Sequence, residues 1–447
     1  MRAGRLAGLP FYTMGRRRRR RRDDKGCSSR EIPSDMLQEI LVKLPIKDVL
    51  QSCRVSRLWR SVVSDPSFRN LHADTYVAPL GDTESLLVSV RSVPGQMDEA
   101  SVFNVSSGKA MCSFPIPSHY GLANACNGLL CFAYDRDGSR GSAPAIVCNP
   151  ATGERLTLPK PPAKDKIRMF ALGFSAPTKE YKLFCLSYPP HSDLPEASVK
   201  VHVYTLGDAR GWRRHSFHSP SRPVDLAAPV LIDGMLYVMT IGWQGTQLPT
   251  KLLVVDVSTE MCYTCHLPAY NAYDESLVGI YEVGGRLCFL AHASNPNSRV
   301  VHCWVMSPSW RDQHFDHNKL TQWDPLYRFK IGPFYPFRPW IAWFEGDKMF
   351  CYITSNTLHN FDLTERSMES VADHGQTVLL DQQLKVPATS PKCKWHIYGG
   401  YRPTLFSPLT FALPSSNDDD NGHESRHQFE LALLHKFKGR KQRRLKI

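Results

Sequence analysis

Apolar residues recur at helical spacing between residues 32 and 72. Ser34 offers an N-cap for a first helix. The apolar positions that follow it are Met36, Leu37, Ile40, Leu41 and Leu44. Pro45 ends this helix, and two more short helices follow, the last ending near residues 64–66. The pattern predicts a small three-helix unit that is marginally stable unless it packs against something else.

The pattern changes to strands between about residue 78 and residue 413. Short apolar runs alternate there with turn clusters, and strong helical periodicity is absent, which predicts an all-β region. Typical runs are Leu86–Val90, Val199–Tyr204, Leu252–Val257 and Val300–Met306. The expected fold is therefore an α+β multidomain chain, with a three-helix unit before a larger β domain.

Two short units recur within the β region, which indicates a repeat architecture. One is a Gly-containing turn that enters an apolar strand, as at Asn127–Cys131 and Asp233–Tyr237. The other is a polar hairpin turn, as at Asn149–Gly153 and Asp256–Glu260. Copies of the second unit begin at residues 104, 149, 256 and 362, which indicates a period of about 50 residues. Four-stranded blades closing into a ring satisfy this period, so we expect a propeller-like domain with six or seven blades.

Positive charge is concentrated at the two ends of the chain. The 447 residues carry a formal net charge of +13, of which residues 1–28 contribute +8 and residues 414–447 contribute +3. We expect a disordered basic leader over 1–28 and a flexible charged tail over 414–447. The folded part, an N-terminal unit over 29–75 and a β domain over 78–413, is nearly neutral. Nucleic acid is therefore not an expected partner of the folded body.

Seven consecutive arginines in the leader form a candidate nuclear-import signal. They are Arg16, Arg17, Arg18, Arg19, Arg20, Arg21 and Arg22. The alternative is a solvated extension without a specific role. No apolar stretch typical of a secretory signal precedes them, and no apolar run is long enough for a membrane helix. The expected location is therefore the nucleus, the cytoplasm or both, with no membrane partner.

Established catalytic motifs are absent from the sequence, including G-x-G-x-x-G, Walker A, H-E-x-x-H and G-x-S-x-G. Residues 262–266 match the C-x-x-C-H spacing of haem attachment, but they lie in a predicted strand whose successive residues face opposite sides. His314 and His317 lack a third ligand nearby. We expect no catalytic residues, no metal and no cofactor. A catalytic set assembled between blades remains the enzyme alternative.

Aromatic residues cluster between residues 310 and 343, with arginine and lysine among them. Such a mixture is typical of a protein interface and could also stack single-stranded bases. Blades pack on aromatic side chains as well, and we favour packing for the tryptophans. A loop rich in proline and aromatic residues is the candidate substrate-binding face. Its residues are Phe334, Tyr335, Phe337 and Arg338.

The N-terminal unit resembles an F-box. The resemblance rests on the run from Ile32 to Pro45, on the Val-Ser-x-x-Trp-Arg segment that starts at Val55, and on the closing Asp65-Pro66-x-Phe68. The β region resembles the F-box-associated, kelch-like domain of plant F-box proteins. That resemblance rests on fragments in a matching order, among them residues 127–131, 149–153, 203–204 and 285–288.

The resemblance implies the substrate-recognition subunit of an SCF-type cullin–RING ubiquitin ligase. The F-box would bind a Skp-type adaptor, and through it the cullin and RING subunits, while the β domain would hold a protein substrate. The implied adaptor-facing residues are Ile32, Pro33, Leu37, Ile40, Leu41, Leu44, Pro45, Val49 and Leu50, some of which must instead form the small core. Val55 and Trp59 are expected in the F-box core. Such a chain performs no chemistry itself, and the alternative is a scaffold acting outside the ligase.

Overall fold

The structure is a computed structural model of the chain. It describes residues 32–75, 84–91, 96–104, 109–134, 143–162, 167–188, 199–217, 221–224, 228–242, 248–270, 278–283, 285–292, 300–307, 322–330, 341–345, 349–354, 357–362, 376–379 and 393–412. The predicted basic leader, with its arginine run, and the predicted charged tail lie outside these residues.

Four helices form the N-terminal unit, where the periodicity predicted three. They are α1 (Ser34–Leu41), α2 (Ile46–Ser52), α3 (Arg57–Ser64) and α4 (Pro66–Thr75). The missed helix, α4, starts directly after Asp65, which has extended backbone dihedrals. The Asp65 carboxylate accepts the N–H of Ser67 at 2.8 Å, and Pro66 occupies the first helical position. An N-cap and a proline at this position start a helix, so the Asp-Pro pair, which predicts the end of the third helix, also starts a fourth.

Antiparallel sheets make up the β region. The first sheet orders its strands as β25 (Cys393–Tyr401), β1 (Glu84–Arg91), β2 (Asp98–Asn104) and β3 (Lys109–Ile116). The second contains β4 (Tyr120–Cys126), β5 (Leu129–Tyr134), β6 (Ile146–Cys148) and β7 (Arg155–Thr157). The third contains β8 (Ile167–Ser175), β9 (Glu180–Tyr188), β10 (Val199–Thr205) and β11 (Arg213–Phe217).

Three more sheets complete the described part of this region. The fourth contains β12 (Ser221–Pro223), β14 (Met235–Gly242), β15 (Lys251–Asp256) and β16 (Cys262–His266), with β13 (Val230–Ile232) also paired to β14. The fifth contains β17 (Val278–Val283), β18 (Arg286–His292), β19 (Val300–Met306) and β20 (Trp323–Lys330). The sixth contains β21 (Ile341–Glu345), β22 (Met349–Thr354), β23 (Thr357–Asp362) and β24 (Gln376–Leu379).

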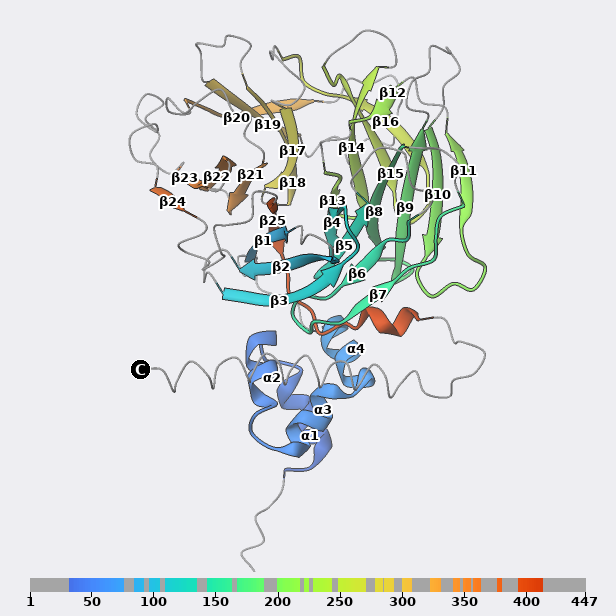
Figure 1. Ribbon diagram of the computed structural model, residues 1–447, viewed down its shortest axis with the longest axis vertical. Coiled ribbons are helices and arrows are strands. Elements are labelled where there is room, and N and C mark those ends of the chain that lie inside the picture. The colour runs from blue at the N-terminus through green and yellow to red at the C-terminus, as the bar shows by residue number, and fades with distance from the viewer. Residues whose placement is uncertain are drawn as a thin grey trace, which may run out of the picture.

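The six described sheets close into a ring (Figure 1). Each sheet contacts the next through inner strands, and β21 of the sixth sheet contacts β25 of the first. The last strand, β25, pairs antiparallel with the first, β1, with Leu86 opposite Tyr398 and Val88 opposite His396. The pairing of β25 with β1 joins the two ends of the chain in one sheet and so closes the ring. The helical unit followed by a β-propeller therefore agrees with the predicted class.

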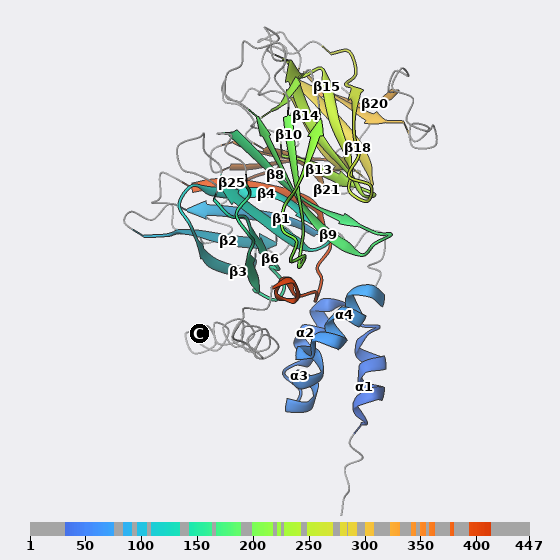
Figure 2. The same cartoon turned by 90° about the vertical axis from the view of Figure 1, so that its right-hand side faces the viewer.

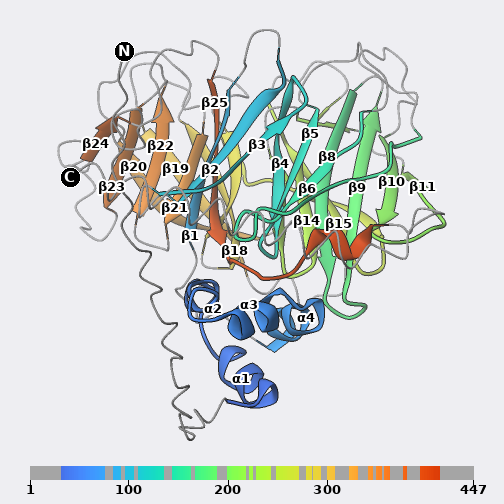
Figure 3. The ribbon, with the colours of Figure 1, turned by 60° about the horizontal axis from the view of Figure 1, so that its bottom comes forward.

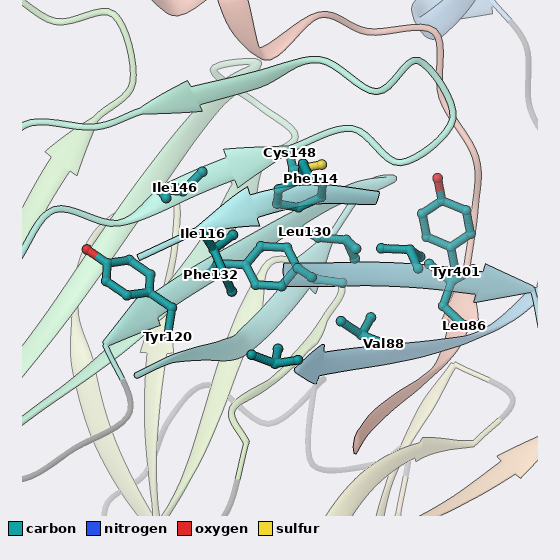
Figure 4. Close-up of a cluster of buried hydrophobic side chains, with 14 residues drawn as sticks. Leu86, Val88, Phe114, Ile116, Tyr120, Leu130, Phe132, Ile146, Cys148 and Tyr401 are labelled. Carbon is teal, nitrogen blue, oxygen red and sulfur yellow. The ribbon is translucent and has the colours of Figure 1, made fainter. Parts of the chain in front are cut away.

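Apolar side chains from neighbouring sheets form the propeller cores. Figure 4 shows one of them, where Leu86 and Val88 of β1 and Phe114 of β3 meet Leu130 and Phe132 of β5. The Phe114 and Phe132 rings meet edge to face, with centroids 5.4 Å apart. Alternate strand residues supply these side chains, which is why the sequence shows short apolar runs instead of helical periodicity.

The four helices lie under one end of the ring, with α4 nearest to the sheets (Figures 1 and 2). A 3-10 helix, η2 (Pro408–Phe411), follows β25 and lies between the helices and the sheets, as the red segment in Figure 3 shows. No helix in the described part of the chain is long and apolar enough to cross a membrane.

Candidate docking surface and domain junction

The helical unit has a buried core to which all four helices contribute. Its buried apolar residues are Leu37, Leu41, Ile46, Val49, Leu50, Cys53, Val62, Val63 and Phe68. Four of the residues that were expected to face an adaptor, Leu37, Leu41, Val49 and Leu50, are therefore core residues in this structure. Leu37 and Leu41 lie one turn apart on α1, so they share the face that packs against the other helices.

Other expected adaptor-facing residues are exposed. Ile32, Pro33, Ile40 and Pro45 are exposed, and Leu44 is half-buried. Val55 was expected in the core, but its side chain is 65% exposed because it lies in the turn between α2 and α3. Trp59 is half-buried and packs against the core cluster.

Exposed apolar side chains are concentrated on this small unit. Within the described residues, the large hydrophobic side chains of the helical unit that are exposed are Ile32, Met36, Ile40, Val55, Leu58 and Leu71. The described propeller residues add only Met97, Met261 and Leu326. Single exposed apolar residues are common on protein surfaces, whereas a concentration on one small element marks an interaction site. We call the set Ile32, Met36, Ile40, Val55 and Leu58 the exposed apolar set.

The sequence contains a signal for two members of this set, Met36 and Ile40. Helix α1 has only eight residues, yet it carries two i, i+4 apolar pairs, Met36/Ile40 and Leu37/Leu41. One apolar pair is enough to face the core of so short a helix. The second pair, Met36/Ile40, is the one that the structure leaves in solvent.

A buried ion pair joins α4 to the propeller. The Arg69 guanidinium donates through Nη1 to Glu154 Oε1 at 2.7 Å and through Nη2 to Glu154 Oε2. Both side chains are almost completely buried. Arg69 also donates through Nε to the carbonyl of Leu405 at 2.8 Å, and the Thr152 hydroxyl donates to Glu154 Oε2 at 2.9 Å. A bidentate pair with these additional partners satisfies both buried charges.

The β6–β7 turn that carries Glu154 also holds the segment after β25. The Asn149 side chain donates from Nδ2 to the carbonyls of Thr404 and Phe406, at 2.9 and 2.7 Å. Its Oδ1 accepts the backbone N–H of Ala151 at 2.9 Å, which shapes the turn. Ala151 and Leu405 are buried in the same cluster as the helical core. The core of the helical unit is therefore completed by two residues from outside it.

His72 connects α4 to the turn between α1 and α2. Its side chain is buried, and Nε2 lies 3.0 Å from the carbonyl oxygen of Leu44, a hydrogen bond in the tautomer that carries its proton on Nε2. Burial lowers the pKa of His72 below its ordinary value of 6.5, and the hydrogen bond to Leu44 opposes this shift in part. A neutral His72 therefore holds the start of α2 in place.

Of the propeller residues predicted to form an interface or a core, the structure describes only some. Phe334, Tyr335, Phe337 and Arg338 lie outside the described residues. Trp323 is half-buried and packs against the core between the fourth and fifth sheets, where its Nε1 donates to the carbonyl of His266 at 2.9 Å. It therefore has the packing role that we favoured for the tryptophans.

The C-x-x-C-H run lies on β16, and its two thiols face different cores. Cys265 is buried in the cluster between the fourth and fifth sheets, whereas Cys262 packs against the cluster between the third and fourth. Thiols on opposite faces of a strand cannot bind one ion. Over the described residues, no three His, Cys, Asp or Glu side chains gather in a way that would hold a metal ion.

A compact helical unit with outward-facing apolar side chains, seated under a β-propeller, is the architecture of an F-box protein with a propeller domain. The family described as "F-box domain" matches residues 30–71, and the one described as "F-box associated beta propeller domain" matches residues 82–330. The second match covers more than half of the chain. The chain therefore belongs to the F-box associated beta propeller family, and strands β21 to β25 follow the matched range.

Similar proteins occur in Arabidopsis thaliana. "Putative F-box protein At5g15660" is 30% identical over 223 residues, which is 48% of this chain and 48% of that protein. The match thus spans about half the length of that relative. "Putative F-box protein At3g10240" is 27% identical over 69% of this chain and 74% of its own length. "F-box protein At5g10340" is 26% identical over 74% and 78%, respectively.

Two solved structures resemble the chain remotely. Apo AztD from Citrobacter koseri covers 66% of this chain and 82% of its own, with 11% identity and a TM-score of 0.32. An oligogalacturonate lyase in complex with manganese has 8% identity over 66% of this chain and 78% of its own, with a TM-score of 0.35. Likeness at this level carries no argument about function.

Proposed function

We propose that this chain is the substrate-recognition subunit of an SCF-type cullin–RING ubiquitin ligase. Its F-box would bind a Skp-type adaptor, and its propeller would hold the protein to be ubiquitylated. The observation that carries the proposal is the exposed apolar set, which stays in solvent although Ala151 and Leu405 complete the core of the helical unit. Apolar side chains that the chain itself does not bury are those that a partner can bury with a gain in free energy.

The role we propose requires no chemistry by this chain. A receptor that binds both the adaptor and a target raises the local concentration of target lysines near the reactive thioester. A closed ring of six sheets is a rigid platform for this task, because every described sheet packs on two neighbours. Binding and positioning are the contributions that this architecture favours.

We place the substrate on the end of the propeller away from the helices. The β6–β7 turn lies against α4, and antiparallel connections alternate between the two ends of a sheet. Connections between sheets, such as Pro117–His119 between β3 and β4, therefore lie at the opposite end. We propose residues 334–338, singled out by their aromatic and arginine side chains in the sequence, as the substrate-binding loop.

The test is co-purification of the full chain with a Skp-type adaptor and cullin. A Met36→Asp/Ile40→Asp variant should lose the adaptor while its melting temperature stays near that of the wild type, because both side chains are exposed. Met261→Asp is the matched control, since Met261 is 57% exposed on the propeller and Met36 is 56% exposed on α1. Adaptor retained by the folded double variant would disprove the proposed surface. Adaptor recovered from wild type without cullin would instead favour a scaffold outside the ligase.

A further inference from the structure

We propose that the β6–β7 turn, Asn149–Glu154, is a joint that fixes the orientation of the F-box on the propeller, with Arg69 as its positioning residue. The two domains would then move as one body. The joint itself is independent of the proposed ligase function. Its consequence for ubiquitylation rests on that function.

Three segments that are distant in sequence meet at this joint. Arg69 comes from α4, Glu154 from the β6–β7 turn, and Leu405 from the segment after β25 (Figure 3). The contact combines apolar burial of Leu405 and Ala151 with a bidentate ion pair. A buried ion pair tolerates little displacement, because movement would leave two charges without partners in an apolar surrounding. The joint therefore resists both sliding and rotation of α4.

The same turn occurs a second time without these joint-forming residues. In both copies the first residue shapes the turn through its side-chain oxygen: Asn149 Oδ1 accepts the N–H of Ala151 at 2.9 Å, and Asp256 Oδ1 accepts the N–H of Ser258 at 2.7 Å. Gly153 donates its N–H to the Asn149 carbonyl as Glu260 does to that of Asp256. The two turns therefore align residue for residue.

The differences between the two copies are the groups that make the joint. Asn149 replaces Asp256 and so adds the Nδ2 donor that holds the Thr404 and Phe406 carbonyls. Glu154 replaces Met261, whose side chain is exposed to solvent, and so adds the carboxylate that binds Arg69. Folding of the turn requires neither group. Their presence in the copy that faces α4 indicates a role in seating the helical unit.

A fixed orientation matters for a ligase receptor. If the adaptor holds the F-box, the joint determines where a target bound to the propeller stands relative to the thioester. Reactions between held groups are sensitive to small changes in position. Loosening the joint should therefore change which lysines are ubiquitylated without changing the affinity for the adaptor, a result that simple loss of stability would not produce.

The first experiment measures domain orientation in the full chain without any partner. Dyes are installed through non-canonical amino acids at Lys43 and Lys160, which are exposed on the helical unit and the propeller. Wild type should show one narrow distance distribution. Glu154→Lys should roughly double its width, since domains without a firm interface move relative to each other by default. Glu154→Gln is a milder variant in case Glu154→Lys does not fold, and Arg210→Gln, which removes an exposed ion pair with Asp208, is the matched control.

A reciprocal variant tests whether the pairing itself carries the effect. Arg69→Glu/Glu154→Arg should recover part of the narrow distribution, because opposite charges face each other again. An unchanged narrow distribution in both folded Glu154 variants would overturn the proposal. The second readout is ubiquitylation in a reconstituted ligase, with the lysines of the propeller itself standing in for those of a target. The Glu154 variants should bind the adaptor as wild type does, but different propeller lysines should be ubiquitylated. If the wild-type chain did not bind the adaptor, the proposed ligase function would be rejected, but the measured distance distributions would still test the joint.

Discussion

The α-carbon of Gly128 lies so close to the carbonyl oxygen of Arg402 that a β-carbon added to it would be 2.6 Å from that oxygen. The same β-carbon would meet the Thr404 side chain at 2.6 Å. Gly128 also has a φ of +80°, which L side chains rarely adopt. The β4–β5 turn therefore packs closely against the segment after β25, which Asn149 also holds through its hydrogen bond to the Thr404 carbonyl.

Gly128→Ala should destabilise the chain more than Gly211→Ala. Both glycines have a φ of +80°, but a β-carbon at Gly211 meets nothing within 4 Å. The shared backbone strain costs about 1–2 kcal/mol. The close approach at Gly128 should add about 1–3 kcal/mol, the typical cost of overpacking. Urea unfolding of the two variants measures the difference, and equal losses would contradict the close contact.

Truncation of Leu41 should lower the stability of the chain, whereas truncation of the neighbouring Ile40 should weaken adaptor binding. Leu41→Ala removes a fully buried side chain and should cost about 2–5 kcal/mol of stability. Ile40 is 45% exposed, so Ile40→Ala should change stability by no more than about 0.5 kcal/mol. Adaptor binding should weaken by about 5–30-fold in Ile40→Ala. Thermal melting and adaptor titration of both variants make the comparison. Strong destabilisation by Ile40→Ala would show that α1 is placed differently.

Stability should fall as pH drops below 6.5, in part through His72. Burial holds the pKa of His72 below 6.5 in the folded chain, so the unfolded chain binds the proton more readily. The stabilisation is complete above pH 6.5 and is lost as pH falls towards the folded pKa. Urea unfolding at pH 7.5 and 5.5 should show a smaller pH dependence for His72→Gln than for wild type. His266→Gln, at an exposed position on β16, is the control. If it reduced the pH dependence of stability as much as His72→Gln does, the effect could not be assigned to His72.

Asn124→Asp should weaken the contact between the second and third sheets. The buried Asn124 side chain donates from Nδ2 to the Leu172 carbonyl and accepts the Leu172 N–H, both at 2.8 Å. A carboxylate of the same shape cannot donate, and it places a buried negative charge beside a carbonyl oxygen. The expected cost is about 3 kcal/mol or more. Asn70→Asp on the exposed side of α4 should stay within about 0.5 kcal/mol, and calorimetry compares the two.

Local sequence patterns predicted where helices and strands lie better than they predicted which of their residues are buried. Apolar spacing predicts α1, but the N-cap of this helix is Pro33 and not Ser34, whose side chain makes no capping hydrogen bond. Asp65-Pro66 predicts a helix end, and in the structure the same pair also starts α4. Helical periodicity marked Leu37 and Ile40 alike, because spacing along a helix shows that a residue is on an apolar face. It does not show whether the helix has one apolar face or two. Spacing along a helix also groups Val55 with Trp59, but Val55 lies in the turn before α3, where helical spacing does not apply.

The joint escaped prediction for a different reason. Residues 149–153 repeat the turn at residues 256–260, and the second copy shows which residues of the first are not needed to form the turn. Arg69 and Glu154 are 85 residues apart, and Asn149 and Thr404 are 255 apart. Spacing cannot pair residues at such separations, because the contact depends on how the whole ring closes. A buried glutamate and a surface glutamate look the same in a sequence.

The sequence by itself determined the class of this protein: a short helical unit, a repeated β domain, and the two family patterns they carry. These follow from local physics, since apolar spacing, caps and turns act over a few residues. Only the tertiary structure decided which apolar residues are left for a partner and how the two domains are held together. Both depend on burial, and burial is settled when β25 pairs with β1, the ring closes, and Leu405 reaches the core of the helical unit.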